Sequence, residues 1–312
     1  MRRLENLLRR ADAWVFAAED ARRLAAVRIG LCGVVALRLA TTDYGVAARQ
    51  PELFQPHFYM DVFERMPSQD VAITLQTCGL VAALLAAAGL AIRASLPLAL
   101  VCWLILQGML NSIGRVIVGD AVLTLCLLVL LACGAAAGEA WSIREPLRVF
   151  RKFRREPGPL PSIPPRGERY GWPIRTAMIV IALAYFFAGL QKWRYSGLPW
   201  VTSDNLRYIL YGQSHPDGLA LFIADRPLLA HAFAAGSLLL ETCFPLLLFV
   251  PKLRWLFIPS VIAMHVAIRI ALGLDYSAQW LTALIVFVNW PVVVGWIRHA
   301  LAPVQAPREA HR

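Results

Sequence analysis

Long apolar runs separated by short polar segments make up most of this sequence. The runs are residues 24–42, 71–92, 95–113, 116–138, 173–193, 227–250, 254–273 and 279–297. Each is long enough to cross the roughly 30 Å hydrocarbon layer of a bilayer as a helix. None alternates apolar and polar residues in the way that barrel strands do. The pattern therefore predicts an all-α integral membrane protein with about eight transmembrane helices.

Polar segments divide the rest of the chain. Residues 1–22 carry leucines at helical spacing among arginines, which predicts an amphipathic helix on the cytoplasmic membrane surface. We expect residues 23–298 to form a single polytopic membrane domain, with a basic, proline-rich cytoplasmic loop at 139–172. Residues 299–312 then form a cytoplasmic tail.

Composition and charge support a membrane protein. Hydrophobic residues make up 58% of the chain, charged residues 16%, and the mean hydropathy is +0.57. The net charge is +11, but the cations flank the apolar runs and form no separate basic domain, so we expect the lipid bilayer and no nucleic acid as partner. If the N-terminus is cytoplasmic, most of the 31 Lys and Arg residues lie inside. This predicts cytoplasmic termini and a location in the cell (inner) membrane.

The cysteines give no sign of a disulfide or metal framework. They are Cys32, Cys78, Cys102, Cys126, Cys133 and Cys243, and all six lie within apolar runs. None forms a CxxC pair. We therefore predict no thiolate metal site and no metal cofactor.

Lys192 is the first candidate for chemistry, at the outer end of the fifth apolar run. The other lysines, Lys152 and Lys252, lie in aqueous basic loops, and all remaining cations are arginine. A desolvated lysine can lose its proton, with a pKa that falls from about 10.4 to about 5 or 6 in extreme cases. Lys192 is thus a candidate base, and the alternative is an interfacial anchor that extends along lipid to water.

Other polar residues fall at the same predicted depth as Lys192. The short loop between the third and fourth runs carries Asn111, Arg115 and Asp120, which form either a functional cluster or a structural Arg115–Asp120 pair. In the seventh run, His265 and Arg269 are four residues apart and share a helix face. His265 is either a functional group or a packing residue.

A second buried pair is predicted deeper in the membrane. Glu241 lies in the inner half of the sixth run, and Arg28 lies at a comparable depth in the first. A buried carboxylate must be paired or protonated, so we predict an Arg28–Glu241 ion pair, with a proton-handling Glu241 as the alternative.

Several of these residues fall in motifs of a known family. The stretch Tyr185-Phe-Phe-Ala-Gly-Leu-Gln-Lys192, followed by Trp200-Val201, resembles the corresponding span of vitamin K-dependent gamma-carboxylases and of the related bacterial HTTM (horizontally transferred transmembrane) proteins. Leu24-Ala-Ala-Val-Arg-Ile29, Gly119-Asp120 and the His265 span that ends in Gly273 are also similar to the pattern of that family. The likeness extends over most of residues 20 to 295.

The resemblance implies a quinone-linked active site at the extracytoplasmic face. Lys192 would be the base that deprotonates a reduced isoprenoid quinone of the vitamin K type, which with O2 and CO2 supports epoxidation and carboxylation of a glutamate in a separate extracytoplasmic protein or peptide. His265 would share the catalytic role. From the residues themselves we expect cations near Lys192 that lower its pKa and hold an anion, namely Arg115, Arg194 and Arg269. The substrate-binding residues would be Arg115, Asp120, Arg269, Tyr185, Trp200 and Asn111.

The chain departs from the carboxylases at two points. Gly119 stands where they carry a histidine, and the 312 residues contain no counterpart of their large extracytoplasmic region. We therefore expect the membrane module alone, with a polar cavity between the third and fourth, fifth and seventh spans. The first functional hypothesis is a membrane-embedded, quinone-linked enzyme resembling the carboxylase and epoxidase membrane domain. The alternative is a non-enzymatic membrane module, such as a small-molecule or peptide transport or immunity partner.

Overall fold

The computed structural model describes residues 2–114, 118–143, 166–213 and 218–301, and these are almost entirely helical. The elements are α1 (Arg2–Val15), β1 (Glu19–Asp20), α2 (Ala21–Thr41), α3 (Gly45–Ala48), η1 (Pro51–Leu53), η2 (Phe58–Val62), α4 (Gln69–Ala87), α5 (Ile92–Asn111), α6 (Val118–Ala132), η3 (Gly134–Gly138), β2 (Arg166–Gly167), α8 (Glu168–Tyr195), α9 (Pro199–Thr202), α10 (Asn205–Tyr211), α11 (Gly218–Ala224), α12 (Pro227–Cys243), α13 (Leu246–Phe249), η4 (Pro251–Leu253), α14 (Arg254–Leu272), α15 (Ser277–Phe287) and α16 (Trp290–Leu301). The two short strands pair in antiparallel register.

Capping residues in the sequence explain where several of these helices begin and end. The Asp20 side chain accepts a hydrogen bond from the Arg22 backbone at the start of α2. Pro227 occupies the first turn of α12, where a proline costs no intrahelical hydrogen bond. Gly273 ends α14 at φ 67°, a left-handed conformation that glycine adopts without steric penalty.

The described residues contain five helices that are long and apolar enough to span a membrane, namely α2, α4, α5, α8 and α14. The α11–α12 pair is bent by 100° and the α15–α16 pair by 74°, so the number rises to seven if each pair is one span. The run at 116–138 forms only the shorter α6, and the run at 227–250 breaks after Cys243. The protein is therefore all-α and of membrane-spanning type, while the eight spans stay a prediction.

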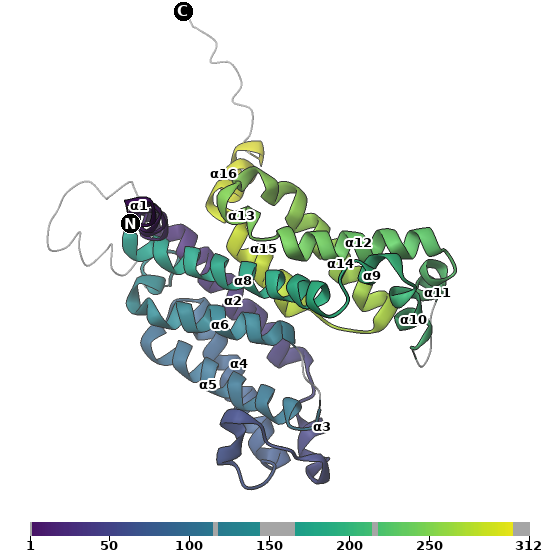
Figure 1. Ribbon diagram of the computed structural model, residues 1–312. Coiled ribbons are helices and arrows are strands. Elements are labelled where there is room, and N and C mark those ends of the chain that lie inside the picture. The colour runs from purple at the N-terminus through teal and green to yellow at the C-terminus, as the bar shows by residue number, and fades with distance from the viewer. Residues whose placement is uncertain (1, 115–117, 144–165, 214–217, 302–312) are drawn as a thin grey trace, which may run out of the picture.

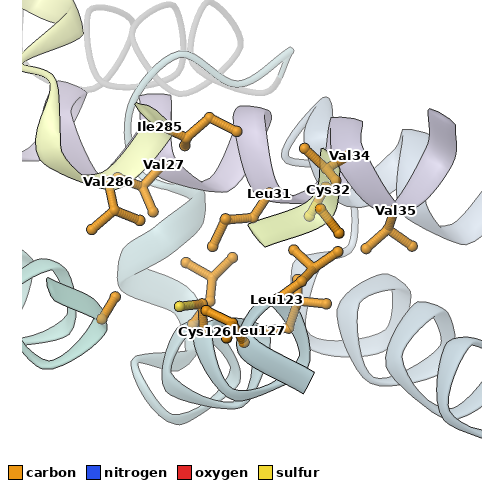
Figure 2. Packing of buried hydrophobic residues seen from close by; sticks show 14 of the residues in the cluster. Val27, Leu31, Cys32, Val34, Val35, Leu123, Cys126, Leu127, Ile285 and Val286 are labelled. Carbon is orange, nitrogen blue, oxygen red and sulfur yellow. The ribbon is translucent and has the colours of Figure 1, made fainter. Parts of the chain in front are cut away.

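The core lies where α2 meets α6 and α15. Val27, Leu31 and Val35 of α2 face Leu123 and Leu127 of α6 in Figure 2, and all five are buried. Ile285 and Val286 of α15 complete the same cluster. Figure 1 shows the α4–α5 hairpin on one side of this core and α9 to α12 with α14 on the other. The α8 helix runs between the two parts and packs against α2, α6 and α15 of the core and against α12.

The outer surface of the long helices is apolar. Large side chains on α4, α5 and α8 are exposed: Ile73, Val81, Leu84, Leu85, Leu98, Val101, Leu183, Phe187 and Leu190. Large apolar surfaces are rarely exposed on soluble proteins. Exposing this surface to water would cost free energy, whereas contact with the hydrocarbon of a bilayer would not.

Candidate functional site

A close contact between α8 and α12 positions the candidate site. A Cβ atom at Gly189 would lie only 2.7 Å from the Thr242 hydroxyl and 2.8 Å from its backbone nitrogen. The Trp193 indole also donates to Thr242 across 3.2 Å. Glycine at this position thus allows α12 to approach the last turns of α8. This contact brings together Lys192, three residues after Gly189, and Glu241, the residue before Thr242.

Lys192 and Glu241 form an ion pair in the wall of a cavity. The ammonium nitrogen lies 2.7 Å from Oε1 and 2.6 Å from Oε2 of the carboxylate. The side chains are 21% and 10% exposed. The Trp200 ring stacks beside the ammonium, with its centroid 5.1 Å from Nζ, at a distance typical of a cation–π contact. The Lys192 ammonium therefore contacts both the Glu241 carboxylate and the Trp200 ring, which an anchor directed only towards water would not do.

Tyr185 and His265 form a second polar pair in the same cavity wall. The Tyr185 hydroxyl and His265 Nε2 are 3.0 Å apart, and both side chains are buried. The His265 ring lies 5.2 Å from that of Tyr276. His265 Nδ1 and the Trp200 indole nitrogen are buried and have no hydrogen-bond partner among the described residues. Buried polar atoms are normally satisfied, so these two mark positions where a ligand can bind.

The cavity between these pairs has a volume of about 500 Å³. Its lining is mostly apolar and comes from α8, α10, α11, α12 and α14, with Leu206, Ile209 and Phe233 as examples. The side chains with polar atoms in this lining are Lys192, Glu241, Tyr185, His265, Trp200, Ser237, Tyr276 and Gln279. A volume of this size with a few polar groups is typical of sites for small molecules. The third span, α5, which we expected to border the cavity, does not contribute to its lining.

Four of the predicted site residues meet in this cavity, and the other predicted residues that the structure describes do not. Lys192, His265, Tyr185 and Trp200 all line it. Asp120 and Arg269 belong to a separate polar group, and Asn111 lies at the end of α5 outside the cavity lining. Arg115 lies outside the described residues.

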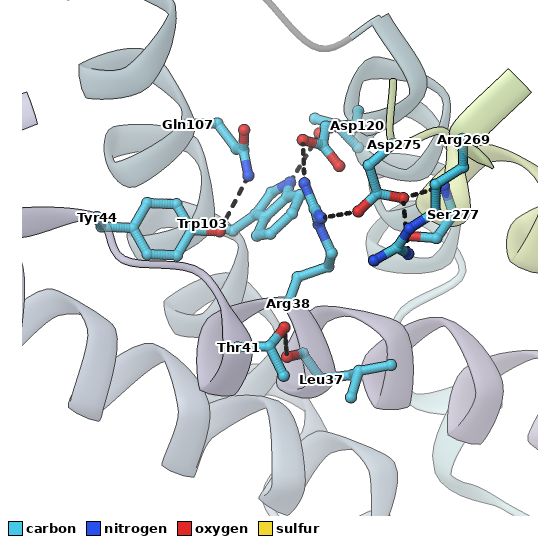
Figure 3. Close-up of polar contacts among 11 residues, drawn as sticks. Leu37, Arg38, Thr41, Tyr44, Trp103, Gln107, Asp120, Arg269, Asp275 and Ser277 are labelled. Atoms are coloured by element: carbon cyan, nitrogen blue, oxygen red, sulfur yellow. Dashed lines mark hydrogen bonds and ion pairs between the residues drawn. The ribbon is translucent and has the colours of Figure 1, made fainter. Parts of the chain in front are cut away.

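The separate polar group, which we call the Arg38 network, joins α2 and α6 to the loop between α14 and α15. Arg38 lies between Asp120, at 3.1 Å, and Asp275, at 2.9 Å (Figure 3). Arg269 lies on the other side of Asp275 at 3.6 Å. Asp275 also accepts a hydrogen bond from the Ser277 backbone. The network fixes the loop that carries Leu274 and Tyr276 into the cavity wall.

These contacts favour the ionised form of Asp275, which lies in the loop between α14 and α15. Burial opposes ionisation of this carboxyl, but the hydrogen bonds from Ser277 and the charges of Arg38 and Arg269 outweigh burial. The pKa of Asp275 is therefore lowered from its ordinary value.

The predicted Arg28–Glu241 pair is wrong. Arg28 donates to the backbone carbonyls of Ala87, Ala137 and Trp141, while Glu241 pairs with Lys192. The prediction assumed that 227–250 is one straight span with Glu241 in its inner half. Instead, the α12 helix overlaps only the last turns of α8, as the stacked rings of Tyr185 and Phe244 show, so its final turn faces Lys192.

The expected cation cluster around Lys192 is also absent from the described residues. Arg269 turns to Asp275, and Arg194 stacks on its neighbour Tyr195. Among the described residues, the charged side chain that contacts Lys192 is the Glu241 carboxylate.

Sequence reasoning missed the contribution of Tyr276 and Gln279 and misplaced Glu241. One signal was available for Glu241, because an isolated lysine and an isolated carboxylate in apolar runs are natural partners. Gln279 lies beside Gly119, where a Cβ atom would lie 3.3 Å from the Cβ of Gln279. Gly119 therefore borders the cavity wall.

Comparison of the chain with protein families, characterised proteins and solved structures found no match. Within the described residues, no group of three or more His, Cys, Asp and Glu side chains is arranged to hold a metal ion.

Proposed function

We propose that this protein is a membrane-embedded enzyme that moves a proton to or from a lipophilic, hydroxyl-bearing ligand. The observation that carries the proposal is the Lys192–Glu241 pair in the wall of a mostly apolar cavity. An ion pair is costly to desolvate, so a pair beside a ligand-sized space favours a functional role over a purely structural one. The resemblance of residues 185–192 to the carboxylase and HTTM family supports the same conclusion.

A reduced isoprenoid quinone fits the cavity in polarity and size. Its oxygen atoms could accept a hydrogen bond from the Trp200 indole and engage His265 Nδ1, the two buried nitrogens that lack partners among the described residues. The apolar lining from α10, α11 and α14 suits a ring and the first part of an isoprenoid chain. Such a quinone, when bound, would supply the redox chemistry and the reaction with O2 and CO2 that the family resemblance implies.

The residues of the chain would handle the proton. For Lys192 to accept a proton from a ligand hydroxyl, its own extra proton must first pass to Glu241, which lies 2.6 Å away. This transfer turns an ion pair into a neutral amine beside a neutral acid, and a dry cavity disfavours the ion pair more than water does. Glu241 thus gives Lys192 a way to become a base without leaving an isolated charge.

Filling the cavity tests this proposal. Ala267→Trp places an indole in the cavity, whereas Ala263→Trp changes the same helix one turn away, outside the lining. We expect a quinone in the lipid extract of purified wild-type protein and of Ala263→Trp, detected by mass spectrometry, and its loss from Ala267→Trp. An equal quinone content in all three proteins, or none in the wild type, contradicts the proposal.

The proposed topology has eight spans, with both termini in the cytoplasm of the cell (inner) membrane. It rests on the distribution of Lys and Arg along the chain. In a background that lacks the native cysteines, Gln55→Cys and Tyr208→Cys should react with an impermeant thiol reagent added to intact cells. Lys252→Cys should react only after lysis, and its labelling in intact cells would reverse the orientation.

A second candidate function is transport of a small molecule. The bends in α11–α12 and α15–α16 favour it, because transporters often build their sites from broken helices. The two functions differ in how the ligand leaves the site. Transport predicts movement of an unchanged ligand across sealed vesicles, whereas an enzyme leaves a chemically altered ligand.

A further inference from the structure

Three arginines gather around one carboxylate at the end of the bundle where α2 and α14 begin. Arg23 of α2 lies 2.7 Å from Glu19, and Arg175 of α8 lies 3.0 Å from the same carboxylate oxygen. Arg254, the first residue of α14, interacts electrostatically with Glu19 and with both other arginines. We call these three arginines the arginine cluster.

The arginine cluster has more positive charge than its surroundings neutralise. Glu19 is the carboxylate that the described residues place against it, so two of the three positive charges lack a counter-charge there. Arg23 is only 8% exposed, and its Nε has no hydrogen-bond partner among the described residues. Like charges in a partly buried place repel strongly unless an anion offsets them.

The chain fixes the three guanidinium groups in place. Arg175 donates to the Ala17 carbonyl across 2.7 Å and stacks on Trp14 of α1, with 5.8 Å between Cζ and the ring centroid. Arg254 donates through Nε to the Leu247 carbonyl and lies over the Phe287 ring. The terminal nitrogens of Arg254 have no carboxylate partner among the described residues. A preorganised guanidinium with unused donors is suited to bind an anion in a bidentate manner.

We propose that Arg23, Arg175 and Arg254 bind a phosphate group. Phosphate carries the charge and the acceptor oxygens that offset two uncompensated guanidinium groups. The three residues lie at or near the ends of membrane-spanning helices, the depth at which phospholipid headgroups lie. The phosphate therefore belongs either to an anionic phospholipid or to a soluble phosphate compound. The site is separate from the cavity and does not depend on the function proposed for it.

Thermal unfolding of the detergent-solubilised full chain tests the site. The probes are short-chain phosphatidylglycerol, short-chain phosphatidylcholine and inorganic phosphate. The test variant is Arg254→Gln, which removes a guanidinium that has no carboxylate partner among the described residues. Its matched control is Lys252→Gln, which removes one charge from an exposed position two residues away.

We expect phosphatidylglycerol to raise the unfolding midpoint of the wild type and of Lys252→Gln. Its apparent affinity should be at least about tenfold lower for Arg254→Gln, because a charge-assisted bidentate contact is lost. The same pattern with inorganic phosphate supports the site and assigns it to a soluble phosphate. A midpoint that does not respond to either anion, or responds equally in all three proteins, overturns the proposal.

A second variant covers the case in which Arg254→Gln does not fold. Arg254→Lys keeps the charge but loses the planar fork of donors. We expect it to fold and to bind phosphatidylglycerol more weakly than the wild type. Wild-type affinity in Arg254→Lys shows that the effect is general charge attraction, and it contradicts a built phosphate site.

Discussion

Among the described residues, the Arg38 network and the Lys192–Glu241 pair both join helices, and they differ in the cation that each one uses. The Arg38 network holds an arginine between two carboxylates and contributes no residue to the lining of the cavity. The second group pairs Lys192 with Glu241, and both line the cavity. Arginine stays charged at any working pH, whereas lysine can give up its proton. The protein thus uses arginine where helices are joined, and lysine, a residue type that can act as a base, beside the cavity.

Removing Arg38 should have the largest effect on stability. Arg38→Leu leaves Asp120 and Asp275 buried or half-buried without their shared cation. We expect a loss of about 3–5 kcal/mol in the free energy of unfolding, the typical result of breaking a buried pair from one side. Denaturant unfolding in detergent measures the loss. A loss below about 1 kcal/mol, the value of an exposed pair, would show that the network does not join the helices.

The second largest effect on stability should come from disturbing the contact between Gly189 of α8 and Thr242 of α12. Gly189→Ala forces α8 and α12 apart, because the added Cβ would lie 2.8 Å from the Thr242 backbone nitrogen. We expect a destabilisation of about 1–3 kcal/mol, as for other overpacked contacts. Gly236→Ala is the matched control on α12, since no atom lies within 4 Å of its added Cβ. Equal unfolding free energies for the two variants would argue against the close approach.

The effects of substituting Lys192 and Glu241 on the free energy of unfolding should be coupled. Lys192→Met and Glu241→Gln should each destabilise the protein, while the double variant loses less than the sum of the two. The expected coupling is about 0.5–3 kcal/mol for residues in direct contact. The same cycle with Arg28→Met in place of Lys192→Met should be additive, because Arg28 contacts backbone carbonyls instead. Additive losses for Lys192 and Glu241 would contradict the pair.

The smallest effect should be a pH dependence that arises at Asp275. Its folded-state pKa is lowered, so its contribution to stability is present above the ordinary value of about 3.9 and is lost as the pH falls through the lowered pKa. Asp275→Asn should cost about 1 kcal/mol at pH 7. The difference from the wild type should shrink below about pH 4 and vanish once the pH is below the lowered pKa of Asp275. Asp61→Asn, at an exposed position, is the control and should match the wild type throughout. A constant difference between wild type and Asp275→Asn across this range would exclude titration as the cause.

The helical membrane class could be predicted from the sequence because apolar runs of about 20 residues match the thickness of a bilayer. Run length could not show that α12 ends at Cys243 or that α11 and α12 meet at 100°. An apolar helix that lines a cavity has the same composition as one that faces lipid. The predicted partner of Glu241 was therefore wrong.

Only part of the candidate site could be predicted, because residues of similar character in the sequence lie in different environments in the fold. Lys192, Tyr185, Trp200 and His265 could be singled out as polar or aromatic residues at one end of apolar runs, and all four line the cavity. Asp120 has the same sequence character but belongs to the Arg38 network. Only the three-dimensional packing of α2 against α6 separates these two environments.

The central claim is that Lys192 must give up and accept a proton. The direct test compares wild-type protein with Lys192→Arg in lipid nanodiscs supplied with a reduced naphthoquinone, with oxygen uptake and the unfolding midpoint measured on the same samples. Arginine can keep the ion pair with Glu241 but cannot act as a base. We therefore predict an unchanged midpoint and a loss of quinol-dependent oxygen uptake by at least about a hundredfold, within the range that general base catalysis contributes. Wild-type uptake by Lys192→Arg would contradict the claim.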